Sequence, residues 1–129
     1  HAPPPGQVHY LAPGERFSVA GVGTVSLEQC PADGLRLSPG ERLAVRWRQG
    51  GERCHLSGRS RNRSLKAIMQ ELGVPPWWRN RVPLVCLGEE VLAVGDLVRC
   101  ESSRWRAAAE EGEPLWEFRW KRPVGASSD

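Results

Sequence analysis

The 129-residue sequence lacks the features that define several large protein classes. No apolar run approaches the roughly 20 residues of a membrane-crossing helix, which excludes a helical membrane span. The phosphate loop GxxxxGK[ST], the nucleophile elbow GxSxG and the zinc-protease motif HExxH are absent. We therefore expect no enzyme activity from this piece of chain alone. Its composition, 40% hydrophobic and 26% charged, is that of an ordinary globular domain.

The spacing of the cysteines excludes the familiar metal motifs. The four cysteines, at positions 30, 54, 86 and 100, include no CxxC pair and no histidine at zinc-finger spacing. Cys86 and Cys100 stand in apolar, strand-like runs, where a thiol acts as a small hydrophobe. The count does not exclude disulfides, but a chain of this length does not need them. We predict four reduced thiols, no metal site and a cytoplasmic protein.

Charge is present in ordinary amounts but is distributed unevenly. The net charge is +3, yet residues 42–81 hold ten basic and two acidic side chains, a local net of +8, so the remainder carries −5. A solvated surface with scattered ion pairs is one interpretation of this cluster. A concentrated basic region beside an acidic remainder favours the other interpretation, a site for a polyanion such as a nucleic acid.

Hydrophobic periodicity predicts mostly strands and one helix. In 42–48 the residues Leu43, Val45 and Trp47 alternate with arginines, which predicts a strand with one buried face. Ser64 is a good N-cap for a helix over 65–72, whose apolar stripe is Leu65, Ile68, Met69 and Leu72. Further strands are expected at 15–20, 22–29, 82–88, 89–95, 97–102 and 114–121, with a loop at 30–41 and a polar connection or short helix at 106–114. The fold class is therefore α+β, with antiparallel strands and one main helix.

Two features near the helix suit a phosphate-bearing ligand. The glycine-rich, arginine-rich loop 49–64 is similar to sites where backbone N–H groups and arginine approach phosphate. Trp77 and Trp78 could stack on a base or ribose. The alternative is hydrophobic packing after the helix, and we expect it for at least one of the two.

From residue 42 onward the chain resembles the C-terminal domain of bacterial tRNA(Ile)-lysidine synthetase. The resemblance is most specific in QELGVPPW (70–77) and continues through Arg79, Pro83-Leu84, Gly88 and Ala93 to the ending WEFRWK (116–121). Residues 1–41 match poorly. We expect residues 1–10 to be a linker or the edge of an excised piece, and 11–129 to be this C-terminal domain with a natural C-terminus.

The resemblance implies a layered β/β/α fold that holds the body and acceptor stem of a tRNA. The full enzyme would use ATP to adenylate the wobble cytidine of the CAU-anticodon isoleucine tRNA, then attach lysine there. Its catalytic N-terminal domain carries an SGGxDS-type loop, which is absent here. ATP and Mg would belong to that domain, and this piece would have no cofactor of its own.

The resemblance also gives the expected tRNA-binding residues, to which strand alternation adds Arg48. They are Arg46, Arg48, Arg53, Arg59, Arg61, Arg63, Lys66, Arg79 and Arg81. An alternative stays open: the same residues could form an interdomain or protein–protein module that packs on an acidic surface, for example that of the catalytic domain. The sequence does not indicate an oligomeric state.

Overall fold

The computed structural model describes residues 7–56 and 62–123, which form two five-stranded antiparallel sheets, a short hairpin and two helices. Sheet A has the order β1 (Val8–Leu11), β5 (Leu43–Arg46), β8 (Leu84–Leu87), β9 (Glu90–Val94), β10 (Val98–Arg99). Sheet B has the order β11 (Trp105–Ala108), β4 (Ala32–Arg36), β12 (Leu115–Lys121), β3 (Gly23–Cys30), β2 (Arg16–Val19). The predicted antiparallel α+β class is confirmed.

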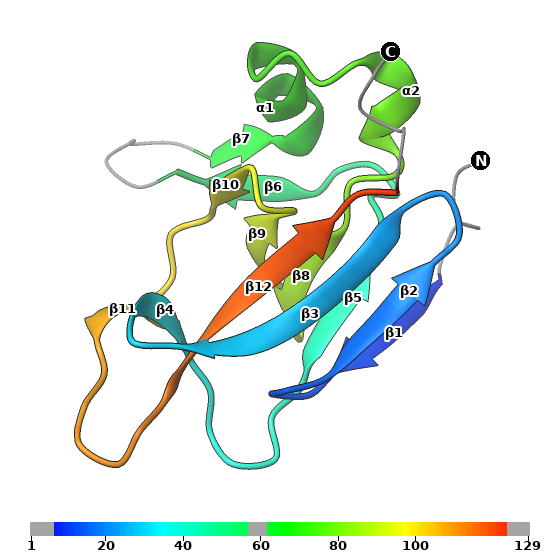
Figure 1. Ribbon diagram of the computed structural model, residues 1–129. Coiled ribbons are helices and arrows are strands. Elements are labelled where there is room, and N and C mark those ends of the chain that lie inside the picture. The colour runs from blue at the N-terminus through cyan, green and yellow to red at the C-terminus, as the bar shows by residue number, and fades with distance from the viewer. Residues whose placement is uncertain (1–6, 57–61, 124–129) are drawn as a thin grey trace.

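The two sheets pack against each other, and the helices lie at one end of this sandwich (Figure 1). That end contains α1 (Leu65–Glu71), α2 (Pro76–Arg79) and the hairpin of β6 (Arg53–His55) and β7 (Asn62–Ser64). We call these four elements the helical end. Loops 37–42 and 109–114 lie at the opposite end, here called the loop end. In the described residues, no helix is long and apolar enough to cross a membrane.

The core lies between the sheets, as the alternating strands predict. Leu43, Val45 and Trp47 are buried, while Arg42 on the other face of the same stretch is exposed. On β12 the inward Trp120 is buried, and Trp116 and Phe118 pack partly against the core. Burying a side chain such as leucine or valine contributes about 1.5–3 kcal/mol, so these alternating positions stabilise the sandwich.

Helix α1 confirms most of the predicted helix and corrects its last position. The Ser64 hydroxyl accepts a 3.2 Å hydrogen bond from the Ala67 N–H, as expected of an N-cap. Leu65, Ile68 and Met69 are buried, but Leu72 is 50% exposed. The helix ends at Glu71 and Leu72 is its C-cap, so the apolar stripe stops one position earlier than expected.

Two predictions of irregular structure are wrong. The expected loop 30–41 contains β4, and the expected connection 106–114 begins within β11. β4 was not predicted because it contains turn-forming residues. One of them is Gly34, where an added Cβ would lie 2.8 Å from the Trp116 carbonyl oxygen and 2.6 Å from the Cys30 sulfur. Glycine is present here because the strands approach closely, a contact that local composition does not reveal.

Several other expected elements are present with altered bounds. The hairpin expected at 82–95 is β8–β9, with Gly88 in the turn at a φ of 61°. The strand expected at 97–102 is the two-residue β10. Strand β1 pairs with β5 from Val8 onward, so sheet structure begins before the boundary expected at residue 10.

The prediction of four reduced thiols is wrong for two of them. Cys54 and Cys100 form a disulfide with a Cα–Cα distance of 5.2 Å and a sequence separation of 46. An isolated bridge between Leu56 and Cys100 brings the end of β6 beside the chain after β10. Cys30 and Cys86 are free, and burial raises the pKa of both thiols. The long separation of the bonded pair explains why spacing gave no indication of it.

Candidate nucleic-acid interface

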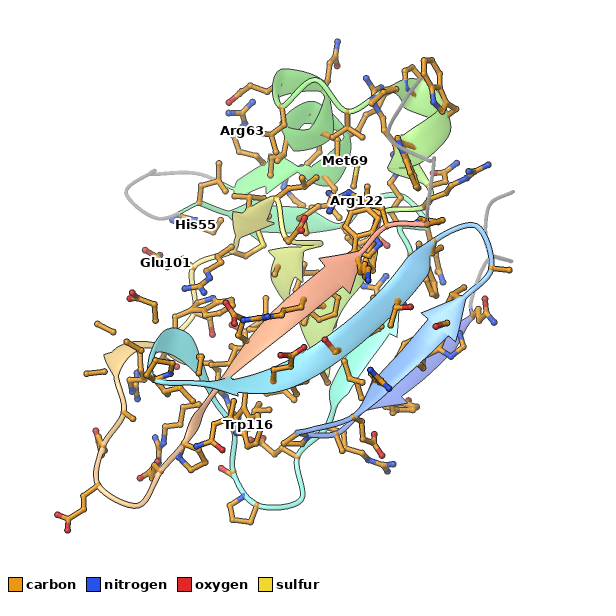
Figure 2. All side chains as sticks on the ribbon, in the orientation of Figure 1. His55, Arg63, Met69, Glu101, Trp116 and Arg122 are labelled. Carbon is orange, nitrogen blue, oxygen red and sulfur yellow. A yellow bond between two sulfur atoms is a disulfide. The ribbon has the colours of Figure 1, made fainter. Side chains whose placement is uncertain are left out.

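The predicted basic residues that the structure describes lie on the helical end or on the strand that leads into it. Figure 2 shows Arg63 at this end and Trp116 toward the loop end. Arg59 and Arg61 lie outside the described residues. The other seven differ in what holds them, and these differences decide which can meet a ligand.

Arg46 is held by the turn that follows its strand. Its guanidinium donates a 2.8 Å hydrogen bond to the Glu52 carboxylate, which also accepts from the backbone N–H groups of Gln49 and Gly50. Burial raises the pKa of Glu52, but the bond from Arg46 and these backbone N–H groups outweigh it and leave the pKa lowered. Arg46 therefore builds the turn that carries the chain into β6, a structural role that the alternation pattern did not reveal.

Three arginines surround α2. Arg48 donates from Nε to the Asn80 side-chain oxygen at 3.0 Å, and Arg79 donates from Nε to the Val74 carbonyl at 2.9 Å. The Arg81 guanidinium lies over the Trp78 ring, 5.5 Å from its centroid. None of these contacts neutralises the positive charge, because their partners are an amide, a carbonyl and an aromatic ring.

The remaining three described residues lie on the hairpin and α1. Arg63 on β7 is paired with Glu71 at the end of α1, at 2.6 Å. Lys66 is exposed on the first turn of α1, and Arg53 is exposed on β6. This side of the helical end therefore carries one arginine paired with a glutamate, together with the exposed Lys66.

The two neighbouring tryptophans have different environments. Trp78 packs edge-on against Trp120 with ring centroids 5.9 Å apart, whereas Trp77 is 64% exposed. The expectation that at least one of them packs hydrophobically is confirmed by Trp78. Trp77 is left as the exposed aromatic group among the arginine-bearing segments of α2.

One basic residue at this end was missed by sequence reasoning. Arg122 lies 3.9 Å from the centroid of the Trp120 ring and makes two hydrogen bonds, 2.9 and 3.1 Å, to the Asp96 carboxylate. Figure 2 shows it near the helical end. It follows the chain from β12, far in sequence from the basic window, so no local count of charge includes it. Its pairing with Asp96 makes it a packing residue.

The arrangement suits contact with phosphate groups more than chemistry on a substrate. Guanidinium groups donate forked hydrogen bonds that match phosphate oxygens. Arg48 and Arg79 are oriented by bonds through Nε, and Arg81 by the Trp78 ring. Among the described residues, no group of three or more His, Cys, Asp or Glu side chains could hold a metal ion. What the helical end offers is oriented positive charge.

Comparison with known proteins gives the chain its family. Residues 43–120 match the family model described as TilS substrate C-terminal domain. The chain is 40% identical over 84 residues to a tRNA(Ile)-lysidine synthase of Pectobacterium atrosepticum, covering 64% of this chain and 18% of that protein. It is 38% identical over 91 residues to the enzyme of that name from Coxiella burnetii, covering 70% and 20%. The chain thus spans about a fifth of the length of the curated relatives it matches.

The fold agrees over a longer stretch than the sequence. A solved structure described as "Crystal structure of TILS C-terminal domain" superposes with a TM-score of 0.69 at 18% identity, covering 90% of this chain and 98% of that one. At this identity the likeness concerns the fold alone. The family model covers more than half of the chain, including the Pro-Pro-Trp segment on which the resemblance was based. The chain therefore belongs to the TilS substrate C-terminal domain family.

Proposed function

We propose that this domain docks tRNA through its helical end while another part of the whole protein performs the chemistry. The observation that carries the proposal is the group of cations at this end whose described partners are not acids. They are Arg48, Arg79 and Arg81 around α2, joined by the exposed Lys66 on α1. These residues come from separate chain segments, and the fold holds them at one end.

Such a surface is suited to recognise the shape and charge of RNA and not the identity of its bases. The major groove of an A-form duplex is too narrow for side chains, so proteins recognise duplex RNA mostly through phosphates, 2′-hydroxyls and shape. Arginines positioned by their Nε atoms match this demand. Selection among tRNAs would then come from their body and acceptor stem.

The names of the relatives support an identity for the RNA. They are called tRNA(Ile)-lysidine synthase, which supports isoleucine tRNA as the partner. We propose that this is the isoleucine tRNA with a CAU anticodon. We propose that the whole protein ligates lysine to the wobble cytidine in the cytoplasm. ATP and Mg would be used by its N-terminal catalytic domain, the other partner of this domain. The 129-residue chain would be inactive alone.

Titration of labelled isoleucine tRNA at two salt concentrations tests the docking. If about four to six cations contact phosphate, log affinity should fall against log salt with a slope of roughly −3 to −5. An unrelated tRNA serves as the control for selectivity. Binding that is absent even at low salt would contradict the proposal.

A charge reversal on α1 locates the surface. Lys66→Glu should weaken binding several-fold and make the salt slope shallower by about 1, because an exposed phosphate contact is lost. The matched control is Arg36→Glu at the loop end, where Arg36 is exposed and paired with Glu113. Equal losses for the two variants would show that only overall charge matters and would contradict a localised dock.

One observation also favours a second candidate function. Arg48 and Arg79 have neutral partners, and guanidinium groups bind carboxylates in the same forked geometry as phosphates, so the same end could pack on an acidic protein surface. Pull-down of the 129-residue chain by the separate catalytic half without RNA, with no tRNA binding by the domain, would favour this interdomain role.

A further inference from the structure

Helix α2 is held from several sides although it has only four residues. The Trp78 N–H donates to the Pro75 carbonyl at 2.9 Å, and Arg79 is tied to the Val74 carbonyl at the same distance. The indole N–H of Trp47 donates to the Arg81 carbonyl at 3.2 Å, and Arg48 binds Asn80. These contacts link α2 to the core and to the segments before and after it, so its orientation is fixed.

This fixed helix presents Trp77 to solvent with 64% of its surface exposed. Its neighbour Trp78 is used in packing, with Trp120 at its edge and Arg81 over its ring. An indole ring presents a broad apolar face, and a ring held in water on a fixed helix is available to a planar partner.

The charges nearby decide which partner fits. Arg79 and Asn80 come two and three residues after Trp77 in the chain, and Asn80 accepts a hydrogen bond from the Arg48 guanidinium. Aromatic side chains placed among cations are the arrangement that binds single-stranded nucleic acid, in which bases stack on rings while phosphates meet the positive charges. A base inside a duplex has both faces covered by its neighbours, so the Trp77 ring needs a base with an open face, which an unpaired base provides.

We infer that Trp77 is a stacking platform for an unpaired base of the docked RNA, with Arg48 and Arg79 binding the phosphates beside that base. The inference rests on the proposed docking function and specifies which part of the RNA meets α2. The unpaired base can come from a single-stranded 3′ end beside a stem or from a bulge or loop. The chemistry of the contact is the same in both.

Three RNA probes separate these sources and test the platform. They are a blunt RNA duplex, the same duplex with a short 3′ adenosine overhang, and the same duplex with a one-nucleotide adenosine bulge. The 129-residue chain should bind at least one of the last two roughly 5- to 100-fold more tightly than the blunt duplex, the range that stacking of one base supplies. Whichever probe shows the gain identifies the source.

Substitutions test whether the Trp77 ring causes the tighter binding of RNA with an unpaired base. Trp77→Ala should remove the preference for unpaired RNA and leave the affinity for the blunt duplex unchanged, whereas Trp77→Phe should keep part of the preference. Tyr10→Ala is the matched control, because Tyr10 is 61% exposed on β1 and also has an arginine, Arg42, over its ring. A preference that survives Trp77→Ala, or falls equally in Tyr10→Ala, would overturn the inference.

A fluorescence measurement on the unaltered chain keeps the test independent of the variants' stability. 2-Aminopurine placed in the overhang or the bulge should be quenched on binding, because stacking on an indole ring quenches its emission. Binding of the blunt duplex with no preference and no quenching would overturn the platform and leave the docking function standing. Failure of all three RNAs to bind at low salt would overturn both.

Discussion

The two ends of the sandwich both carry arginines, but they use them differently. At the loop end, Arg36 is paired with Glu113 at 2.6 Å and Arg104 makes a two-pronged pair with Glu41 at 2.5 and 2.9 Å. The helical end also has carboxylate-paired arginines, Arg46 with Glu52 and Arg63 with Glu71. It differs in having three more, Arg48, Arg79 and Arg81, which meet an amide, a carbonyl and a ring. A carboxylate partner cancels the charge of an arginine, whereas these neutral partners only orient it.

Arginine content alone therefore does not identify a binding surface, because the number of nearby acidic side chains decides how much positive charge remains. Glu110 and Glu111 add further negative charge to the loop end, where an apolar groove is lined by Pro13, Leu37, Pro39, Pro114 and Trp116. Polyanions should therefore be repelled by the loop end and attracted by the helical end, and the predictions below test what keeps the two ends different.

The largest expected effect comes from the contact that ties the helical end to the sandwich. Met69 is fully buried in the common core, so Met69→Ala should lower the free energy of unfolding by about 2–5 kcal/mol. Leu72→Ala, on the same helix but half-exposed, should cost less than about 1 kcal/mol. Urea unfolding measures both. Similar costs for the two would contradict the observed end of α1, and a negligible cost for Met69 would make the helical end an independent unit.

The disulfide should have the next largest effect and should act mainly on the helical end. It joins β6 to the chain after β10 across a separation of 46 residues, and closing such a loop typically contributes about 2–4 kcal/mol. The Cys54→Ser, Cys100→Ser double variant should lose this stability, and dithiothreitol should destabilise the parent chain but not that variant. Cys30→Ser, at a free and half-buried cysteine, is the control.

Hydrogen exchange would sharpen this second prediction. After reduction, amides of β6 and β7 should exchange faster, while amides of β2 and β3 at the other side of the fold should change little. A parent chain whose unfolding does not respond to the reductant would show that the disulfide does not contribute to stability.

The fold was predictable wherever one face of an element is buried along its whole length. β5 alternates cleanly and α1 has an apolar stripe after a serine N-cap, so their periods were visible in the sequence. β12 follows the alternation less strictly, because Leu115 is buried although it lies on the face opposite Trp116. β4 was not predictable, because Asp33, with a φ of 55°, and Gly34 are typical turn residues and a close approach of strands requires the glycine. Leu72 fits the spacing of the apolar stripe, but helix α1 ends at Glu71, so Leu72 is its C-cap and not a buried helix position.

The candidate site was predictable as a region but not residue by residue. The described basic residues of 42–81 lie around the hairpin and helices because most of this continuous stretch of chain forms that end of the fold. The sequence could not separate Arg46, bound to Glu52, from Arg48, bound to Asn80, because the partners are fixed by tertiary contacts. Nor could it show which of two adjacent tryptophans stays in solvent.

The smallest expected effect compares one carboxylate at each end as pH falls. The hydrogen bond from Arg104 and the Ser38 N–H lower the pKa of Glu41; for Glu52, burial opposes this, but Arg46 and the turn N–H groups still lower the pKa. A lowered pKa in the folded state means that stability is present above the unfolded value and is lost as pH falls through the folded one. At neutral pH, Glu52→Gln should cost about 1–3 kcal/mol, because Arg46 and two backbone N–H groups lose their charged acceptor. Glu41→Gln should cost about 1 kcal/mol or less, since its pair with Arg104 is more exposed.

Urea unfolding at a series of pH values measures both costs. The stability that each variant lacks should shrink as pH falls below the ordinary glutamate pKa of about 4.3 and should vanish below the lowered pKa of the folded parent. Because Glu52 shapes the turn leading into the hairpin, its loss should also weaken RNA binding, whereas loss of Glu41 should not. A deficit that stays constant down to low pH would show that packing, and not the ionised carboxylate, holds the turn. Equal loss of RNA binding in both variants would remove the functional difference between the two ends.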